Sequence, residues 1–344
     1  MRQVWIPRAG PPEVLELREA RDPLPARGEL RIRVEASGVN FADVMGRLGR
    51  YPDLPPMPVV VGYEVAGRVD AVGDDVEADW IGRDVLALTR FGGYADVVCA
   101  PERQVHARPP GMSAEEGAAL PVNYLTAWQL LHVMGGVKEG ETVLVHSVGG
   151  GVGIAATQIA RRAGAHVIGT ASAGKHDFLK SLGVAHAIDY RSENFEERVR
   201  ELTRGRGVEL ALDAVGGDSW RKSYRCLAPT GRLGLFGISS AATSKSPGLL
   251  DRVATPLRLL FRTPWLQFNP VSLISHNKGV FGVNLGHLWE EQDRVAGWME
   301  ALLGLYKTGA LRPVVAERFP LERAADAHHY LQDRRNVGKV LLVP

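Results

Sequence analysis

The chain has 344 residues and a nearly balanced charge, with 41 basic and 39 acidic side chains. Such a balance produces no strong positive field, so composition does not favour a nucleic-acid partner. Cys99 and Cys226 lie far apart, which excludes a disulfide framework and a cysteine-built metal site. No uncharged run reaches the roughly 18 residues of a membrane-spanning helix, and the N-terminus lacks a secretory leader pattern. We therefore expect a cytoplasmic protein with two domains.

The first part of the chain, residues 1–122, alternates short strand-like runs with glycine and proline. This pattern predicts an irregular, mostly antiparallel β domain. The strand-like runs are residues 30–34, 59–62, 65–69, 84–88 and 94–98. Near residue 114 the pattern becomes helical, and Ser113 and Glu116 have the spacing of a capping box. We expect the first domain to end close to that helix.

Residues 142–153 read Thr-Val-Leu-Val-His-Ser-Val-Gly-Gly-Gly-Val-Gly, an apolar strand followed by a glycine-rich turn. The turn leads into a helical run, residues 154–162, and then into a second strand candidate. Glycine lets the backbone approach a pyrophosphate closely, and the helix N-terminus offers free N–H groups to the phosphates. The stretch therefore predicts a dinucleotide site within a βαβ unit.

Strand and helix patterns alternate from residue 123 to residue 285, which predicts a doubly wound parallel sheet. The runs are residues 143–146, 154–163, 167–170, 177–182, 210–213, 220–227 and 233–236. Beyond them we expect a helix at 292–306, a strand at 314–319 and an apolar segment at 340–343 that rejoins the first domain. The predicted divisions are thus 1–122, 123–285 and 286–344.

Several motifs in this order resemble the medium-chain dehydrogenase/reductases, specifically the zinc-free quinone oxidoreductase (zeta-crystallin-like) group. The motifs are residues 38–43, 62–67, 125–127, the glycine turn, 212–216 and 337–340. In the C-terminal third, residues 268–270, 281–286 and 335–339 resemble the vesicle amine transport protein branch. The resemblance covers nearly the whole chain. It implies an α/β fold in which a GroES-like β domain accompanies a Rossmann domain.

The same resemblance argues against a catalytic zinc. Zinc-dependent relatives carry cysteine where this chain has Asn40, and histidine where it has Tyr63. Asparagine and neutral tyrosine are poor zinc ligands. The four-cysteine segment of those relatives is represented here by Cys99 alone. We therefore expect no metal.

Without a metal, the acceptor itself must be electron-poor, as quinones and α,β-unsaturated carbonyls are. The resemblance implies an NADPH-dependent reductase that transfers a hydride to such acceptors. It places Asn40 beside the nicotinamide and the acceptor carbonyl, with Tyr51 as a second donor and Asp43 orienting both. Asn40 as a turn cap and Tyr51 as a packing residue are the structural alternatives.

Further cofactor contacts follow from the resemblance, in the glycine turn, at the ends of later strands and near the C-terminus. They are Thr126, Gly150, Gly151, Val152, Gly153, Val215, Phe236, Gly237, Phe281, Val283, Asn336 and Lys339. The apolar members are equally well explained as core residues.

The segment after the second strand of the βαβ unit indicates cofactor choice. NAD sites place Asp or Glu about 20 residues past the glycine turn, to bind the ribose 2′-hydroxyl. This chain has no acid there and instead offers Ser172 and Lys175, with Tyr190 and Arg191 further on. These side chains suit a 2′-phosphate, so we predict NADPH.

Two questions of assembly and function stay open at this stage. The strand candidate at residues 279–283 would be the last of the parallel sheet, and pairing with its copy predicts a homodimer. Residues 245–269 are amphipathic, basic and interrupted by Pro256 and Pro264. They predict a lid over the substrate or a contact with the neighbouring subunit, the alternative being a helix on a membrane surface. A nucleotide-binding protein with little turnover and a membrane or vesicle partner is the second functional class.

Overall fold

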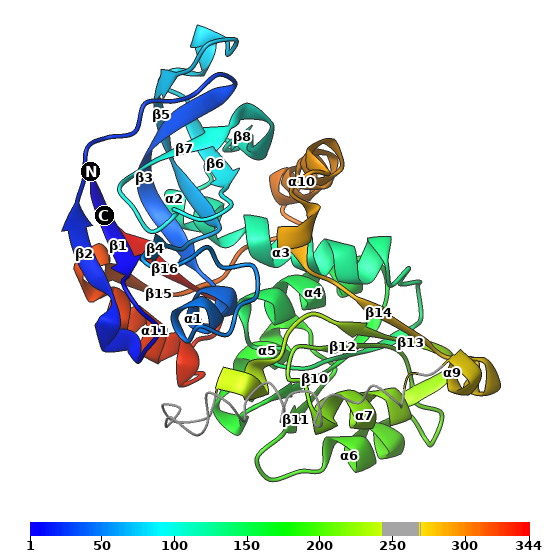
Figure 1. The fold of residues 1–344 in the computed structure, drawn as a ribbon. Helices are drawn as coiled ribbons and strands as arrows, with labels where there is room; N and C mark the ends of the chain where they lie inside the picture. Colours follow the sequence, from blue (N-terminus) through cyan, green and yellow to red (C-terminus); the bar gives the residue numbers. More distant parts are fainter. Residues whose placement is uncertain (243–267, 269) are drawn as a thin grey trace. The chain divides into compact units, whose positions relative to one another are not determined.

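A computed structural model of the protein describes residues 1–242, 268 and 270–344 (Figure 1). The chain forms two compact units. The first unit comprises Met1–Leu125 and Leu285–Pro344, and the second comprises Thr126–Asn284. The predicted divisions after residues 122 and 285 fall within a few residues of these limits. The segment 245–269 lies outside the described residues, apart from Phe268.

A seven-stranded sheet dominates the first unit, in the order β15-β16-β3-β5-β6-β8 with β7 paired to β3. Its strands are β3 (Glu29–Val39), β5 (Glu64–Val72), β6 (Asp84–Leu88), β7 (Val97–Pro101), β8 (Val105–Ala107), β15 (Val315–Pro320) and β16 (Lys339–Val343). A three-stranded antiparallel sheet consists of β1 (Arg2–Ile6), β2 (Glu16–Glu19) and β4 (Val59–Val60). The mostly antiparallel GroES-like domain is thereby confirmed.

The side-chain alternation of β3 explains why this sheet forms. Leu30, Ile32 and Val34 are buried on one face, as a strand with period two requires. The C-terminal strand β16 pairs antiparallel with β3, so the apolar end of the chain does rejoin the first unit as expected. This pairing brings residues near 340 beside residues near 39, which places two distant predicted site segments side by side.

Helices of the first unit include one that was predicted from its cap. They are α1 (Phe41–Arg47), α2 (Ala114–Ala119), α10 (Gln292–Lys307) and α11 (Ala324–Gln332). The Glu116 N–H donates to the Ser113 hydroxyl at 3.1 Å, and the Ser113 N–H donates to the Glu116 carboxylate at 3.2 Å. The capping box is therefore confirmed. One further helix, α3 (Pro121–Trp128), contains the boundary between the units.

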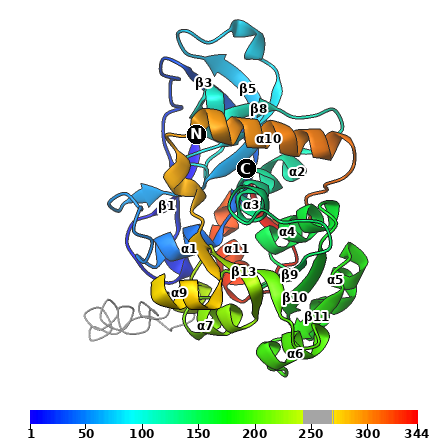
Figure 2. The ribbon, with the colours of Figure 1, turned by 90° about the vertical axis from the view of Figure 1, so that its right-hand side faces the viewer.

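The described strands of the second unit form a six-stranded parallel sheet, in the order β11-β10-β9-β12-β13-β14. They are β9 (Thr142–Val145), β10 (His166–Ala171), β11 (His186–Asp189), β12 (Val208–Asp213), β13 (Leu227–Leu235) and β14 (Gly279–Gly282). Figures 1 and 2 show helices on both faces of the sheet. They are α4 (Gly151–Arg162), α5 (His176–Leu182), α6 (Phe195–Leu202) and α7 (Asp218–Arg225), followed later by α9 (Pro270–His276). The doubly wound fold is confirmed.

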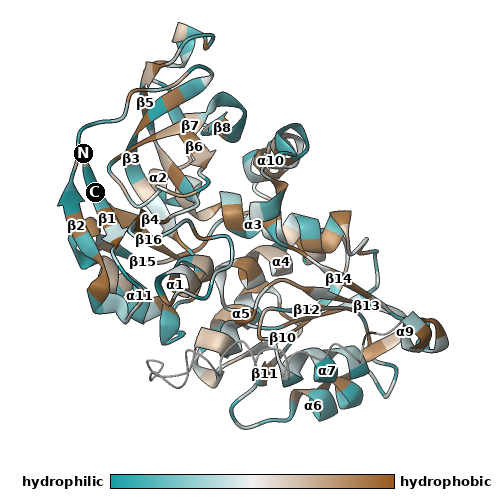
Figure 3. Ribbon diagram, viewed as in Figure 1, coloured by the Kyte–Doolittle hydropathy of each residue, from teal (hydrophilic) through white to brown (hydrophobic). Residues whose placement is uncertain are grey.

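Hydropathy separates the layers of this second unit. Its strands are largely apolar, whereas α6 and α7 carry many polar residues (Figure 3). Leu144, Ile168 and Leu233 belong to one buried cluster on the sheet. Burial of such side chains on both faces is what a parallel sheet requires. None of the described helices is long and apolar enough to cross a membrane.

Some predicted boundaries were wrong. The sequence pattern predicts one element over residues 220–227, but α7 begins at Asp218 and ends at Arg225. Leu227 instead opens β13, where it pairs with Val208 of β12. Strand β7 begins three residues after the start of the predicted run 94–98. Tertiary pairing decides such limits, because single-sequence patterns do not contain the partner strand.

Candidate functional site

The glycine turn lies at the carboxyl end of β9, where it leads into α4. Gly150 occupies the N-cap of α4 and supplies no side-chain cap, so the first N–H groups of the helix point outward without a capping partner from a side chain. A Cβ on Gly153 would lie only 2.6 Å from the carbonyl oxygen of Ser147. Ser147 itself has a φ of 54°, in the left-handed region. The turn therefore needs glycine at 153 and has the geometry of an anion-binding helix N-terminus.

Val148 of the glycine turn is buried, and its side chain lies against β10. Its side chain packs on β10, where a Cβ on Gly169 would stand 2.5 Å from the Val148 Cγ1. A valine at 148 is thus accommodated by a glycine on the neighbouring strand. The side chain does not narrow the approach to the α4 N-terminus.

The predicted cofactor contacts of the second unit lie at one end of its strands. Because all six strands are parallel, their carboxyl ends meet there. Ser172, Tyr190, Val215, Phe236 and Val283 each follow the end of a different strand. Phe281 lies within β14, with its ring against Gly234 of β13. Thr126 is buried in α3.

Lys175 lies along the glycine turn. A Cβ on Gly149 would be 3.0 Å from the Lys175 Cδ, so the lysine stem covers the turn from the side of β10. Ser172 is the residue that follows β10 by one position. Tyr190 is 38% exposed, and the Arg191 guanidinium lies 5.9 Å from its ring centroid. A positive charge therefore stands beside the turn, where a 2′-phosphate needs one.

A buried polar network beneath the turn was not anticipated from the sequence. His146 lies 3.0 Å from the Thr170 hydroxyl and 2.9 Å from the Ser223 hydroxyl. Ser223 donates to Asp213 at 2.7 Å, and Asp213 also accepts from the backbone N–H of Val215 at 2.7 Å. Burial lowers the pKa of His146, an effect that the Asp213 carboxylate opposes. The network joins the ends of β9, β10 and β12.

A second polar cluster, in the first unit, contains Asn40. The Lys339 ammonium donates to the Asn40 Oδ1 at 2.6 Å and also binds the Glu64 carboxylate. The Asn40 amide donates from its Nδ2 to Glu64 at 3.0 Å. All three side chains are buried, and Lys339 is only 3% exposed. The cluster fixes which way the Asn40 amide faces.

Asp43 and Asn336 hold the backbone near this cluster. Asp43 accepts from the Asn40 N–H at 2.7 Å, from the Gly62 N–H at 3.2 Å and from the Tyr94 hydroxyl at 3.0 Å. Burial raises the pKa of Asp43 to about 7, although these hydrogen bonds oppose the effect. Asn336 donates to the Gly338 carbonyl at 2.9 Å.

The Asp43 hydrogen bonds continue into a fully buried chain that the sequence did not reveal. Arg47 donates from Nε to the His328 Nδ1 at 3.2 Å. This fixes the neutral tautomer with a proton on Nε2, which donates to the Tyr94 hydroxyl at 3.1 Å, and Tyr94 donates to Asp43. Burial and the Arg47 charge lower the pKa of His328 to about 3. The predicted site residues Asn40 and Asp43 are therefore braced by a chain of four side chains, which come from two helices and one loop.

Tyr51 lies in the same unit and is partly exposed. Its ring centroid is 6.2 Å from that of Tyr63, in an edge-on arrangement. In the sequence, Tyr63 stands out only because zinc-dependent relatives carry histidine at this position. Its hydroxyl oxygen is buried and has no hydrogen-bond partner among the described residues. A satisfied core tyrosine would have a partner, so the residue needs a separate explanation.

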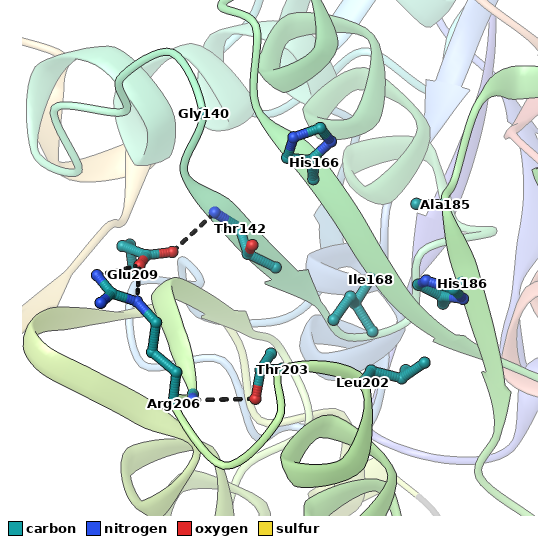
Figure 4. Close-up of a pocket in the computed structure, with 11 residues that line it drawn as sticks. Gly140, Thr142, His166, Ile168, Ala185, His186, Leu202, Thr203, Arg206 and Glu209 are labelled. Atoms are coloured by element: carbon teal, nitrogen blue, oxygen red, sulfur yellow. Dashed lines mark hydrogen bonds and ion pairs between the residues drawn. The ribbon is translucent and has the colours of Figure 1, made fainter.

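One cavity of about 510 Å³ lies at the amino ends of the strands in the second unit's sheet (Figure 4). Thr142, His166 and His186 line it, and each begins a strand. The amino ends of the strands thus surround it, whereas the glycine turn lies at their carboxyl ends. Glu209 accepts from the Thr142 N–H at 2.8 Å and from Arg206 at 3.1 Å. The cavity is distinct from the predicted cofactor site.

Comparison with known proteins matches both units. Residues 26–110 match the alcohol dehydrogenase GroES-like domain, and residues 151–301 match the family described as zinc-binding dehydrogenase. The human synaptic vesicle membrane protein VAT-1 homolog is 40% identical over 333 residues, which cover 96% of this chain and 82% of that protein. The chain belongs to the medium-chain dehydrogenase/reductase family.

Quinone oxidoreductases are similar over the full length. The Pseudomonas aeruginosa quinone oxidoreductase is 35% identical to this chain. The matched region spans 100% of this chain and 99% of that protein. The crystal structure of the Escherichia coli quinone oxidoreductase complexed with NADPH superposes with a TM-score of 0.85 at 30% identity, covering 100% of both chains. This family member therefore stands close to quinone oxidoreductases and VAT-1 homologues.

Zinc does not suit the residues at the family's metal position. The Lys339 ammonium already places a positive charge between Asn40 and Glu64, where a cation would be repelled. The neighbouring Tyr63 has a pKa raised by burial, so its hydroxyl stays neutral and binds metals poorly. Across the described part of the chain, no group of three or more His, Cys, Asp or Glu side chains is placed to hold a metal ion.

Proposed function

We propose that this protein is an NADPH-dependent, metal-independent reductase that transfers a hydride to quinones or α,β-unsaturated carbonyls. The observation that carries the proposal is the buried Lys339 ammonium, which binds Glu64 and Asn40 and leaves no place for a metal cation between them. Without a Lewis acid, acceptors that are already electron-poor are the suitable class. NADPH, when bound, supplies the hydride.

Residues at the carboxyl ends of the second unit's strands support the proposal that the protein binds NADPH. The uncapped N-terminus of α4 suits the pyrophosphate, and the absence of an acid after β10 suits a 2′-phosphate. The side chain of Lys175 lies beside the glycine turn. The solved relative from Escherichia coli is an NADPH complex.

In the catalytic half, each side chain has a limited task. Lys339 and Glu64 hold the Asn40 amide in one orientation. Asp43 fixes the backbone of Asn40, and we assign to Asn40 a hydrogen bond to the acceptor oxygen. Tyr51 is the second donor in this proposal. Asn336 positions the turn before Lys339.

The test is oxidation of NADPH, followed by its absorbance, on addition of 1,4-naphthoquinone or members of a 2-alkenal panel. We expect turnover with at least one acceptor, a preference for NADPH over NADH, and unchanged rates after treatment with a chelator. Tight cofactor binding without turnover of any acceptor would overturn the proposed activity. Loss of turnover on removal of stoichiometric zinc would overturn its metal independence.

A second candidate function is supported by the similarity to the human VAT-1 homolog, which is named a synaptic vesicle membrane protein. In that case the chain would bind NADPH, turn over little and associate with a vesicle or membrane. Sedimentation with anionic liposomes separates the two candidates. We propose the cytoplasm as the compartment and expect the protein to stay in the supernatant.

We further propose that the protein is a homodimer. Strand β14 is the last strand of the parallel sheet among the described residues, and none of the described strands pairs with its outer edge. Next to it, α9 exposes Val271 and Ile274 by 72% and 76%. An open strand edge beside exposed aliphatic side chains suits a second copy of the same surface.

A further inference from the structure

Three aromatic rings of the first unit form a cluster around Tyr63. The centroid of the Tyr63 ring is 6.2 Å from that of Tyr51 and 5.3 Å from that of Phe91. Phe91 has a φ of 151°, a conformation that side-chain-bearing residues rarely adopt. Strained backbone of this kind persists where the surrounding structure requires it, and it is frequent at binding sites. The ring of Phe91 thus packs against Tyr63 although the backbone of Phe91 is strained.

The Tyr63 hydroxyl is the exceptional atom of the cluster. It is buried, and within the described ranges no group accepts from it or donates to it with hydrogen-bond geometry. A buried hydroxyl without a partner lowers stability, and phenylalanine would pack equally well without that loss. The tyrosine side chain as a whole is only partly buried. Its hydroxyl is therefore better explained by a partner that arrives with a ligand.

The surroundings keep this hydroxyl neutral. Burial raises the pKa of Tyr63 strongly, and the charges of Asp43 and Asp53 act in the same direction. The neighbouring Tyr51 raises the pKa further, through its charge and through a hydrogen-bonding interaction that lies outside ordinary hydrogen-bond geometry. A tyrosine in this state keeps its proton throughout the neutral and mildly alkaline range. It can donate a hydrogen bond to a developing oxyanion but does not give its proton away.

The position of Tyr63 in the chain places it beside the Asn40 cluster. Glu64 follows it directly, and that carboxylate binds both Asn40 and Lys339. Gly62, directly before it, donates its N–H to Asp43. Both neighbours of Tyr63 are therefore fixed by Asn40 or by the residues that position it.

We propose that the Tyr63 hydroxyl donates a hydrogen bond to the carbonyl oxygen of the bound acceptor. This inference rests on the proposed function. In the reaction, a hydride from NADPH forms a new C–H bond on the acceptor, and the displaced π electron pair moves onto the carbonyl oxygen. Tyr63 stabilises this oxyanion and keeps its own proton. Water supplies the proton that completes the product, and NADP⁺ leaves.

The test is the substitution Tyr63→Phe, which removes one oxygen atom. We expect kcat with 1,4-naphthoquinone to fall about 100-fold, as when one oxyanion donor is removed from other enzymes. The Kd for NADPH should stay unchanged, and Tm should stay the same or rise by about 2 °C because an unsatisfied hydroxyl is gone. An unchanged kcat would overturn the inference. A lowered Tm together with weakened NADPH binding would instead assign Tyr63 a structural role.

Tyr224→Phe provides the matched control. Tyr224 lies in the second unit, and its hydroxyl is also buried without a hydrogen-bond partner in the described structure. Its ring packs against Phe268 and His276, away from the strand ends that we assign to the cofactor. This substitution should leave kcat unchanged, so that only Tyr63→Phe separates activity from stability. An equal fall of kcat in both variants would overturn the assignment.

A spectroscopic measurement tests the same contact without turnover. With NADP⁺ in place of NADPH, the infrared C=O stretch of bound 1,4-naphthoquinone should lie lower in wild type than in Tyr63→Phe. The same frequency in both proteins would overturn the inference even in an active enzyme. Conversely, a shifted frequency in a protein that fails to oxidise NADPH would overturn the proposed reductase function alone. Failure of wild type to bind the quinone would overturn both.

Discussion

At the scale of single residues, we predict that cofactor choice depends on Lys175, whose side chain lies along the glycine turn. Replacing it with alanine removes a charge-assisted hydrogen bond to the 2′-phosphate, which contributes about 1.5–3 kcal/mol. Lys175→Ala should therefore raise the Kd for NADPH by about 10- to 100-fold and leave the Kd for NADH nearly unchanged. Fluorescence titration with both cofactors measures this.

A suitable control for this substitution is Lys180→Ala. Lys180 is exposed in the last turn of α5, one helix further along the chain. The substitution Lys180→Ala removes one positive charge from the second unit, as Lys175→Ala does, but leaves the glycine turn unchanged. If Lys175→Ala weakens NADPH and NADH equally, the lysine supports the turn and does not recognise the phosphate.

His328 makes the stability of the first unit depend on pH. Burial and the charge of Arg47 lower its pKa to about 3, below the ordinary value of 6.5. Below about pH 6.5 the unfolded state therefore binds a proton at His328 that the folded state does not bind. The free energy of unfolding consequently decreases as pH falls. Asp43 acts oppositely, because its pKa is raised to about 7 and its contribution is lost as pH rises. Wild type alone thus shows the two effects partly cancelled.

A His328→Gln variant separates them. Glutamine can accept from Arg47 and donate to Tyr94, but it does not titrate. Between about pH 6.5 and pH 4, wild type should lose stability relative to the variant by about 1.4 kcal/mol per pH unit. Urea unfolding at several pH values measures the difference. A difference that is constant with pH would show that His328 takes up a proton in the folded protein.

At the scale of elements, the start of α4 depends on one glycine. A Cβ on Gly153 would meet the Ser147 carbonyl oxygen at 2.6 Å, and backbone cannot move aside as a flexible side chain can. Gly153→Ala should therefore displace the turn and weaken NADPH at least about 10-fold, measured by calorimetry. Gly304→Ala in α10 is the control, because its Cβ would meet no atom within 4 Å. The control should be neutral or stabilising by up to about 1 kcal/mol.

If Gly153→Ala binds NADPH as wild type does, the pyrophosphate does not rest on this turn. Such a result, with the variant still folded, would remove the central argument for the dinucleotide site. Circular dichroism and Tm of both glycine variants establish whether the fold is retained.

Patterns along the chain were sufficient for elements whose cause is local. The box of Ser113 and Glu116 predicted α2, and the glycine turn predicted the β9–α4 junction, because caps and turns act within a few residues. Strand β11 and helix α6 were missed. Their sequences are largely polar, and β11 is defined by pairing with β10, which no local pattern contains.

The candidate site divides in the same way. Ser172 is predicted from its place after the second strand of the βαβ unit and Val215 from the family resemblance, and both residues follow the carboxyl end of a strand. The resemblance predicts Lys339 as a cofactor contact, and the structure adds that its ammonium binds Asn40 and Glu64 inside the first unit. These partners are 299 and 275 positions away. A contact of that range depends on β16 pairing with β3, which only the folded chain supplies.

At the scale of the whole molecule, the outer edge of β14 should be the surface that joins two copies. In a parallel strand, alternate N–H groups point to opposite sides. The Val283 N–H donates to Leu235 of β13 at 2.8 Å, so the Gly282 N–H points to the open edge. A Cβ at Gly282 would have ample space, its nearest neighbour being 4.0 Å away. Proline at 282 therefore removes an edge donor without breaking the pairing with β13.

Sedimentation velocity at micromolar concentration should find wild type as a dimer and Gly282→Pro as a monomer. The matched variant Gly282→Ala keeps the N–H and should stay dimeric, which separates the loss of a donor from the addition of a side chain. Exposed Val271 and Ile274 on α9 should become protected from solvent in the dimer, so their replacement by serine should weaken it further. A monomeric wild type would show that the edge stays unpaired. A Gly282→Pro protein that remains dimeric would show that the copies join through another surface.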